Sequence, residues 1–240
     1  HSFPAMIPWL ESTDAFPPLE QALDEPNGLL CAGGDLSPQR LIQAYRQGIF
    51  PWYAKGEPVL WWSPDPRMVL VPSEFRISRS LRRTLRAGDY RINLDSNFQD
   101  VIRACARTRR KGQSGTWITA EMQAAYCTLH ELGFAHTVET WIDDKLAGGL
   151  YGLAIGKMFY GESMFSHATD ASKIALAHLA RFLDDQGFGL IDCQMDTPHL
   201  ASLGARQVPR SEFIARLREL TAIPPRQGRW PSDGATRDWG

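Results

Sequence analysis

The chain has 240 residues, of which 43% are hydrophobic, and its formal net charge is −1 at pH 7. This is the composition of a globular protein with a full core, so it excludes a disordered chain and offers no overall charge for binding nucleic acid. No apolar run reaches the roughly 18 residues that cross a bilayer, and no basic segment followed by an apolar one begins the chain, so we expect a soluble cytoplasmic protein.

The four cysteines lie far apart in the sequence, at Cys31, Cys105, Cys127 and Cys193. No Cys-x-x-Cys pair occurs, which argues against a zinc site and against a disulfide scaffold. The six histidines also lack the spacing of metal ligands. We therefore expect reduced thiols and no bound metal.

The first 36 residues are rich in proline and glycine, which predicts successive turns and little regular structure. Ser37 followed by Pro38 is typical of a helix start, and the helix is expected to stop at Gly48. Three tryptophans come next. Trp61 and Trp62 are expected in the core, whereas Trp52, held between a proline and a turn, could stack on a nucleotide base.

From residue 68 the pattern alternates between strands and helices. The expected elements are, in order, a strand at 68–71, a helix from 78, a strand at 90–94, helices at 97–107 and 119–131, strands at 134–142, 145–155 and 158–164, a helix at 170–186, a strand at 190–195, and a last helix at 211–220. The three strands in the middle of this series predict an antiparallel meander. After Pro224 we expect a loop.

Positive charge is concentrated between residues 74 and 111, where eleven basic residues accompany four acidic ones. Four of these arginines share one stripe of the helix that follows Ser78, namely Arg79, Arg82, Arg83 and Arg86. Such a run is commonly a solvated helical face. The alternative interpretation is a surface for phosphates, because arginine forks suit phosphate and four like charges on one stripe repel each other until an anion arrives.

Three polar residues interrupt otherwise apolar strands. Glu162 lies inside the strand at 158–164, and Asp192 and Gln194 lie in the strand at 190–195. Burying an ionised carboxylate without partners is costly, so Glu162 is expected to be paired, to face a cleft, or to serve chemistry. Residues two apart share a face of a regular strand, so Asp192 and Gln194 are expected to point the same way. Together they suggest one site.

Two catalytic motifs are nearly matched. The segment Arg109-Arg-Lys-Gly-Gln-Ser114 resembles the loop with which acetyltransferases hold coenzyme A, but a serine replaces its last glycine. The segment Gly161-Glu-Ser-Met-Phe165 resembles a nucleophile elbow that has lost its second glycine. A serine hydrolase built from Ser163, His199 and Asp192 stays a minor alternative for this reason.

Eight blocks in order carry a family resemblance. They are Glu25-Pro-Asn-Gly-Leu-Leu, Gly33-Gly-Asp-Leu-Ser-Pro, Gly48-Ile-Phe-Pro-Trp, Leu60-Trp-Trp-Ser-Pro-Asp-Pro-Arg, Gly115-Thr-Trp-Ile-Thr, Gly161-Glu-Ser-Met-Phe-Ser, Ile191-Asp-Cys-Gln and Ser202-Leu-Gly-Ala. From about Pro8 to Phe213 the chain resembles the leucyl/phenylalanyl-tRNA–protein transferases. The resemblance implies an α/β (α+β) fold, with a small N-terminal domain at residues 1–66. A GNAT-like (acetyltransferase-like) catalytic domain at residues 67–240 would carry a mixed, largely antiparallel sheet flanked by helices.

The function that this resemblance implies is transfer of leucine or phenylalanine, and less well methionine, from aminoacyl-tRNA to a protein with an N-terminal arginine or lysine. The added residue would mark that protein for degradation by the N-end rule. The donor ester is already activated, so no cofactor, metal or covalent nucleophile is expected. We expect a cytoplasmic enzyme without a membrane partner, acting as a monomer.

The resemblance also implies roles for individual residues. Asp192 would act as a base or anchor the α-amino group, Gln194 would orient or relay, and Glu162 would hold the donor or the incoming amine. A structural alternative for Asp192 is a carboxylate satisfied by backbone donors at a strand end.

Substrate-binding roles follow in the same way. Trp52 and Trp117 would flank the terminal adenosine of the tRNA, and the stripe of Arg79, Arg82, Arg83 and Arg86 would bind its acceptor stem. The residues of the side-chain pocket would be Leu150, Phe159, Leu176, Leu179 and Leu183. Phe159 and Glu162 lie on opposite faces of a regular strand, so both can face the ligand only if a bulge occurs, for which Gly161 is the expected place.

Two other functional classes stay open. One is an acetyltransferase-like enzyme that uses coenzyme A. The other is a binding module without catalysis that recognises tRNA or protein N-termini, in which case Asp192→Asn would change no measurable property.

Overall fold

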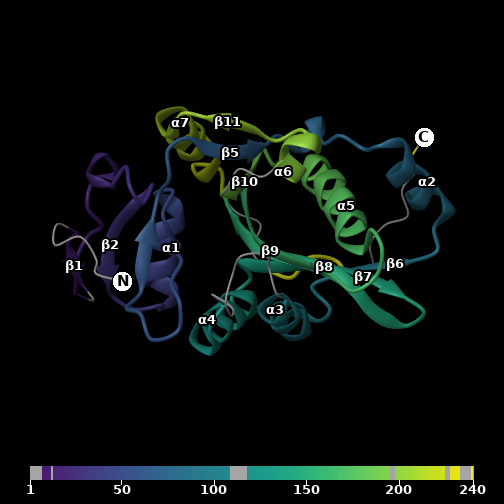
Figure 1. The fold of residues 1–240 in the computed structure, drawn as a ribbon, viewed down its shortest axis with the longest axis horizontal. Coiled ribbons are helices and arrows are strands. Elements are labelled where there is room, and N and C mark those ends of the chain that lie inside the picture. The colour runs from purple at the N-terminus through teal and green to yellow at the C-terminus, as the bar shows by residue number, and fades with distance from the viewer. Residues whose placement is uncertain are drawn as a thin grey trace.

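The computed structural model describes residues 7–11, 13–108, 118–194, 198–224, 228–232 and 239. Two sheets dominate the fold, a small one built from the first quarter of the chain and a large one built from the rest (Figure 1). In the part of the chain that the structure describes, no helix is both long and apolar enough to cross a membrane.

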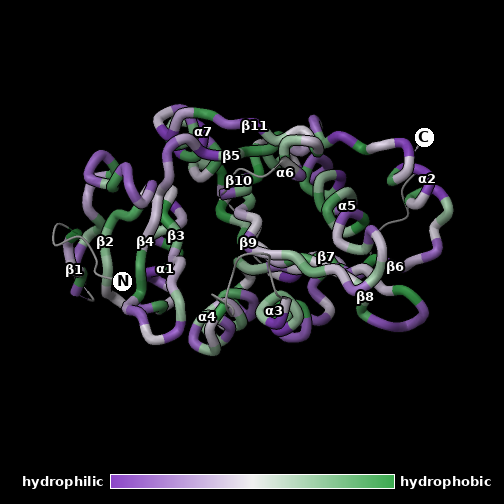
Figure 2. Tube along the Cα trace, viewed as in Figure 1, coloured by the Kyte–Doolittle hydropathy of each residue, from purple (hydrophilic) through white to green (hydrophobic). Residues whose placement is uncertain are grey.

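The small sheet has four strands in the order β1-β2-β4-β3. Their bounds are Trp9–Leu10 for β1, Leu29–Gly33 for β2, Phe50–Pro51 for β3 and Leu60–Trp62 for β4. The expectation of little regular structure in the first 36 residues was therefore wrong for β2. All five of its residues are buried, so the strand is a continuous apolar run without the alternation that marks a half-exposed strand. Figure 2 shows β2 and β4 as hydrophobic segments side by side.

The large sheet has seven strands in the order β11-β5-β10-β9-β8-β7-β6. The bounds are Arg67–Leu70 for β5, Arg91–Leu94 for β6, Ala135–Ile142 for β7, Lys145–Ile155 for β8, Met158–Ser166 for β9, Leu190–Gln194 for β10 and Arg206–Val208 for β11. All neighbouring pairs are antiparallel except β9 and β10, which are parallel. The predicted mixed, largely antiparallel sheet and its meander are confirmed, whereas β11 was not expected.

Helices cover both faces of the large sheet (Figure 1). Helices α3 (Phe98–Arg107) and α4 (Ala120–Glu131) pack on one face, and α5 (Ala171–Asp185) packs on the other. The remaining helices are α1 (Pro38–Arg46), α2 (Arg79–Ala87), α6 (Pro198–Ser202) and α7 (Arg210–Thr221). Predicted caps are confirmed at Ser37, Ser78 and Thr119, because each side chain accepts a hydrogen bond from a backbone N–H of the first turn.

The small sheet, α1, α7 and the α3/α4 face of the large sheet share one hydrophobic core. It runs from Trp61 through Tyr45 to Tyr126, Tyr160 and Phe213, all of which are almost fully buried. A second core lies between the opposite face of the large sheet and α5. The interpretation that a domain boundary lies at residues 66 and 67 would place it between β4 and β5, where the chain passes from one sheet to the other.

Candidate active site

A cavity of about 500 Å³ lies where the small sheet meets strands β8, β9 and β10 and helix α5. Trp52 and Trp62 line it from the small sheet, and Leu150, Leu176 and Leu179 line it from β8 and α5. Glu162, Asp192 and Gln194 bring the polar groups. Predominantly apolar walls with a few convergent polar groups are typical of a small-molecule or substrate site.

A bulge in β9 places Glu162. Tyr151 pairs with Ser163 and Gly152 pairs with Gly161, so Glu162 is the extra residue of β9. The bulge expected near Gly161 is therefore confirmed. Such a bulge turns a side chain out of the regular alternation of a strand, and here it lets Glu162 line the cavity while remaining almost buried, with 9% of its surface exposed.

The Glu162 carboxylate accepts two hydrogen bonds at one oxygen. The Tyr45 hydroxyl donates to Oε1 over 2.6 Å, and the Gln194 side-chain amide donates to the same atom over 3.3 Å. The hydroxyl of Tyr126 is in turn hydrogen-bonded to that of Tyr45. The pKa of Glu162 is raised to about 7: burial is the largest cause, the negative charge of Asp192 adds to the rise, and the two hydrogen bonds oppose it.

Asp192 is buried in a bidentate ion pair with Arg67. The guanidinium donates from Nε to Oδ1 over 3.2 Å and from Nη2 to Oδ2 over 2.8 Å, and both side chains are fully buried. Nη1 of Arg67 also donates to the carbonyl of Gly48, and the guanidinium lies 4.3 Å from the ring centre of Phe213. Arg67 thus connects Asp192 to the segment between α1 and β3 and to α7.

Gln194 ends β10 in an unusual backbone conformation. Its φ is +63°, in the left-handed region that side chains other than glycine rarely adopt, and its N–H donates to Oδ1 of Asp192 over 3.0 Å. The pairing of β10 with β5 shifts register between Asp192 and Gln194, so the regular alternation that predicted a shared face does not hold there. The three polar residues still meet, because irregular backbone in β9 and in β10 brings them together.

The predicted pocket residues divide into two groups. Leu150, Leu176 and Leu179 line the cavity, whereas Phe159 and Leu183 do not. Both of these are fully buried in the core on the α5 side of the sheet. A regular β9 sends Phe159 to that side, and only the bulge after it redirects Glu162.

Of the two tryptophans expected beside adenosine, Trp52 lines the cavity and Trp117 lies outside the described residues. The backbone carbonyl of Trp52 accepts a hydrogen bond from the Trp62 indole over 2.7 Å, and the two rings pack edge to face. Trp62 was expected only as core, yet it also lines the cavity. No local pattern distinguishes a core tryptophan from one at the rim of a site.

The rival motifs are not supported by this geometry. Both carboxylate oxygens of Asp192 accept from Arg67, so they are already committed and do not orient a histidine. Ser163 lies in extended β9 paired with Tyr151, not on the sharp strand-to-helix turn of a nucleophile elbow. Burial raises the pKa of the Cys193 thiol well above its usual value, which makes a thiolate nucleophile unfavourable. The segment 109–114 lies outside the described residues.

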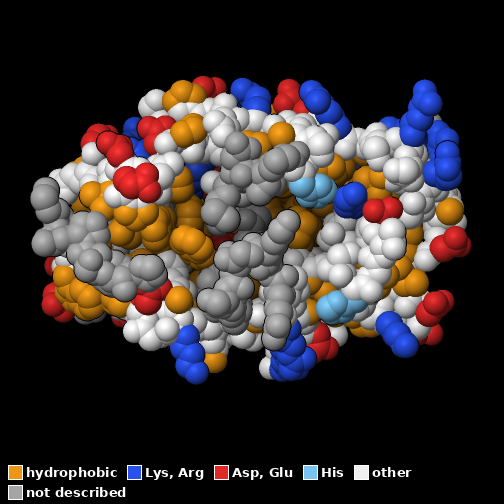
Figure 3. Space-filling model, in the orientation of Figure 1, with side chains coloured by type: hydrophobic (Ala, Val, Ile, Leu, Met, Phe, Trp, Pro, Cys, Tyr) orange, Lys and Arg blue, Asp and Glu red, His pale blue; other side chains and the backbone are white. Residues whose placement is uncertain are grey.

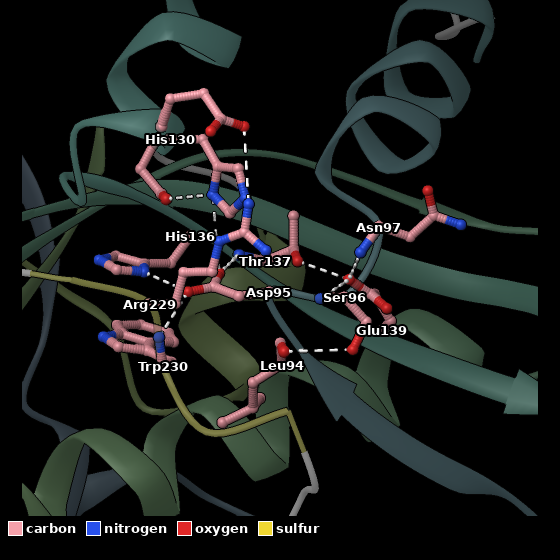
Figure 4. A network of polar contacts seen from close by, with 12 residues as sticks. Leu94, Asp95, Ser96, Asn97, His130, His136, Thr137, Glu139, Arg229 and Trp230 are labelled. Carbon is pink, nitrogen blue, oxygen red and sulfur yellow. Dashed lines mark hydrogen bonds and ion pairs between the residues drawn. The ribbon is translucent and has the colours of Figure 1, made fainter.

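Figure 4 shows a second polar network, which is centred on Asp95 and Glu139. Asp95 accepts hydrogen bonds from the His136 ring and from the backbone of Thr137 and Trp230, at 2.7, 2.9 and 2.7 Å. Glu139 accepts from the backbone N–H groups of the two residues that precede α3. None of these residues lines the cavity, and the bonds join β7 to the residues between β6 and α3 and join Asp95 to Trp230, so the network is structural. Among the described residues, no group of three His, Cys, Asp or Glu side chains could hold a metal.

The arginine stripe lies on the surface of α2. Arg79, Arg83 and Arg86 are exposed, while Arg82 is partly buried and donates a hydrogen bond to the carbonyl of Trp239. Figure 3 shows basic side chains gathered at the end of the molecule where α2 lies. The predicted stripe is therefore accessible to a large anionic partner at three of its four positions.

Comparison with known families decides the relationship. The family model described as leucyl/phenylalanyl-tRNA protein transferase matches residues 69–218, and the model of that family's N-terminal domain matches residues 34–65. The chain belongs to this family. Tyr45 lies in the second matched segment and Glu162, Asp192 and Gln194 lie in the first, whereas Arg67 lies in the gap between the two.

Relatives bearing the family's name extend over nearly the whole chain. A leucyl/phenylalanyl-tRNA–protein transferase of Nitrosomonas europaea is 64% identical over 228 residues, which are 95% of this chain and 96% of the relative. One from Azoarcus sp. is 57% identical over 98% of this chain and the whole of the relative. Among solved structures, a protein of unknown function from Staphylococcus epidermidis aligns with a TM-score of 0.42 and 10% identity over 75% of this chain and 68% of that one, a likeness too low to carry an argument.

Proposed function

We propose that the chain transfers leucine or phenylalanine, and less well methionine, from aminoacyl-tRNA to the N-terminal arginine or lysine of a protein. The observation that carries this is the cavity itself, in which leucine side chains form the wall and Glu162, Gln194 and Asp192 form the polar end. Membership of the family supports the same reaction. The product would enter degradation by the N-end rule, and the donor places the reaction in the cytoplasm. We expect the enzyme to act as a monomer.

The reaction needs alignment more than activation. The ester that joins the amino acid to its tRNA is already reactive, so the protein must hold the ester, bring a neutral amine to it and remove one proton. Leu150, Leu176 and Leu179 offer an apolar wall for the leucine or phenylalanine side chain. Trp52 offers a ring face for the terminal adenosine, and stacking of one base on an aromatic ring is worth ~1–3 kcal/mol.

The proposed fold of the catalytic part is GNAT-like. It rests on the family resemblance and is supported by the mixed sheet with helices on both faces. The parallel pair β9 and β10 ends its pairing at Tyr160 and Asp192, and Glu162 and Gln194 each come two residues later. The place where two parallel strands stop pairing thus coincides with the polar end of the cavity.

Transfer can be measured with labelled leucine on tRNA and two peptides that differ only in their first residue, arginine or aspartate. We expect the arginine peptide to be labelled and the aspartate peptide to stay unlabelled. Labelled phenylalanine should behave like leucine, and labelled methionine should transfer more slowly. No transfer to the arginine peptide, with tRNA still bound, would favour a binding module instead. Binding of acetyl-coenzyme A without tRNA would favour an acetyltransferase.

Charge reversal on α2 should weaken tRNA binding. Arg83→Glu combined with Arg86→Glu is the better variant, because Arg82 also bonds to the carbonyl of Trp239. We expect lower affinity for all tRNAs and a smaller slope of log affinity against log salt, by about two, because contacts to phosphate release counterions. The control is Arg216→Glu with Arg218→Glu on exposed positions of α7, which changes the net charge equally. Equal affinity of the two double variants would contradict the assignment.

A further inference from the structure

We propose that Glu162, rather than Asp192, accepts the proton from the attacking amine, and that Tyr45 is the residue that positions its carboxylate. This proposal rests on the proposed transferase function. It departs from the roles that the family resemblance implies, in which Asp192 is the base or the amine anchor and Glu162 holds the donor or the incoming amine.

Asp192 is poorly placed to take a proton. Oδ1 accepts from Arg67 Nε and from the Gln194 backbone, Oδ2 accepts from Arg67 Nη2, and the side chain has no exposed surface. The guanidinium is a permanently charged partner, and the Asp192 carboxylate already accepts three hydrogen bonds, two of them from it. An amine that approached Asp192 would have to compete with these bonds for a side chain that has no exposed surface.

Glu162 has a carboxylate oxygen that accepts no hydrogen bond from the described residues, and Asp192 has none. Both of its hydrogen bonds go to Oε1, and Oε2 has no hydrogen-bond partner within the described part of the chain. The β9 bulge turns this side chain to the cavity, where the ester and the amine would meet. Glu162 Oε2 is therefore the carboxylate oxygen that an amine can approach without breaking a contact between described residues.

Tyr45 fixes the orientation of that carboxylate. Its hydroxyl donates to Oε1 and is bonded to the Tyr126 hydroxyl, and its backbone carbonyl accepts from the Tyr160 hydroxyl over 2.6 Å. These contacts tie α1 to α4 and to β9 around Glu162. Tyr45 touches no reacting atom, so it is a positioning residue.

The titratable groups that face Glu162 from other elements belong to four of them. Tyr45 faces it from α1, Tyr126 from α4, Asp192 from β10 and Arg67 from β5. Burial and the Asp192 charge raise its pKa, and the Tyr45 hydrogen bond and Arg67 lower it, with a result of about 7. A base whose pKa lies near the working pH is both ionised and basic enough to take a proton from the amine.

In the proposed step, Glu162 takes up one proton and later releases it. The amine nitrogen forms a bond to the ester carbonyl carbon, and Glu162 Oε2 takes one proton from that nitrogen. The bond between the carbonyl carbon and the ribose oxygen then breaks, and Glu162 returns the proton to the ribose oxygen. The products are the new peptide bond and a tRNA with a free hydroxyl, and Glu162 is again a carboxylate.

The test is the pH dependence of single-turnover transfer to an arginine peptide at subsaturating concentration. The peptide amine, with a pKa of about 7.7–8.0, must be neutral, and Glu162 must be ionised. Each requirement makes the rate rise with pH. In wild type, the log of the rate plotted against pH should therefore have a slope that approaches two below pH 7. Glu162→Gln should retain only the amine limb, with slope one, and should be slower by about 10²–10⁴-fold at pH 7.5. A slope of one in wild type, or an equal rate in Glu162→Gln, would overturn the proposal.

A second variant and a control make the outcome specific. Tyr45→Phe removes a bond that favours the ionised carboxylate, so its lower limb should move to higher pH by about one unit. An unshifted limb would contradict the role of Tyr45. Glu219→Gln, an exposed change of the same kind on α7, should match wild type. If wild type transfers nothing, the proposed function fails; if it transfers with slope one, only the assignment of the base fails.

Discussion

Arg67→Ala is expected to lower the free energy of unfolding by about 3–5 kcal/mol at pH 7.5, because it leaves Asp192 as an unpaired charge in the core. The guanidinium supplies two hydrogen bonds to that carboxylate and is itself fully buried, so no exposed group can replace it locally. Chemical denaturation followed by circular dichroism measures the change. The exposed control Arg218→Ala should change stability by less than about 0.5 kcal/mol.

The loss in Arg67→Ala should depend on pH with a defined sign. An unpaired buried charge destabilises the fold only while it is ionised, so the deficit should be small at acid pH and should grow as pH rises.

A double variant separates the lost charge pair from the lost packing. Arg67→Met with Asp192→Leu removes both charges and keeps side chains of similar length, so it should recover most of the stability while lacking activity. A loss below about 1 kcal/mol in Arg67→Ala, or a double variant as unstable as the single one, would contradict the account of this pair.

Gly152→Ala is expected to disrupt the fold or to destabilise it by about 3 kcal/mol or more. Overpacking typically costs about 1–3 kcal/mol and occasionally more, and the backbone at this site leaves no room for adjustment. A Cβ on Gly152 would meet the carbonyl oxygen of Tyr160 in the neighbouring strand and would lie 2.5 Å from the ring of Phe159. The carbonyl belongs to the strand ladder and cannot move without opening the pairing next to the bulge.

The matched control lies directly opposite in the same bulge. Among the described residues, a Cβ on Gly161 would meet the carbonyl oxygen of Asp192, at 3.6 Å, and a methyl of Ile191, at 4.0 Å, which are ordinary contacts. Gly161→Ala should therefore fold with nearly wild-type stability. Thermal unfolding of both variants checks the prediction, and equal stability of the two would show that the bulge is not packed as described.

Helix boundaries and the central strands could be predicted because their signals are local. Ser78 and Thr119 cap helices within three residues of themselves, and Gly156 with Lys157 marks the turn between β8 and β9. The anomalous carboxylates Glu162 and Asp192 also stood out, because charged residues in apolar strands are unusual.

Other features depend on pairings that the sequence does not display. Strand β2 is a wholly apolar run among turn residues. It lacks the alternation of apolar and polar residues that marks a half-exposed strand, and the residues on either side of it are typical of turns, so the sequence does not identify it. Arg67 meets Asp192 across 125 positions of the chain, and an arginine at the start of an apolar strand reads locally as a surface residue. The Glu162 bulge could be inferred only from a conflict, because Phe159 and Glu162 could not both face a ligand from a regular strand. In the structure, the bulge directs Glu162 to the cavity, whereas Phe159 lies in the core.

Transfer of labelled leucine or phenylalanine from charged tRNA to an arginine peptide, run with wild type beside Glu162→Gln, tests most directly whether this cavity is the active site. We expect wild type to label the peptide and Glu162→Gln to be slower by about 10²–10⁴-fold at pH 7.5 while binding tRNA with unchanged affinity. Wild type that binds tRNA without transfer, or a variant as fast as wild type, would contradict the proposed chemistry of the cavity.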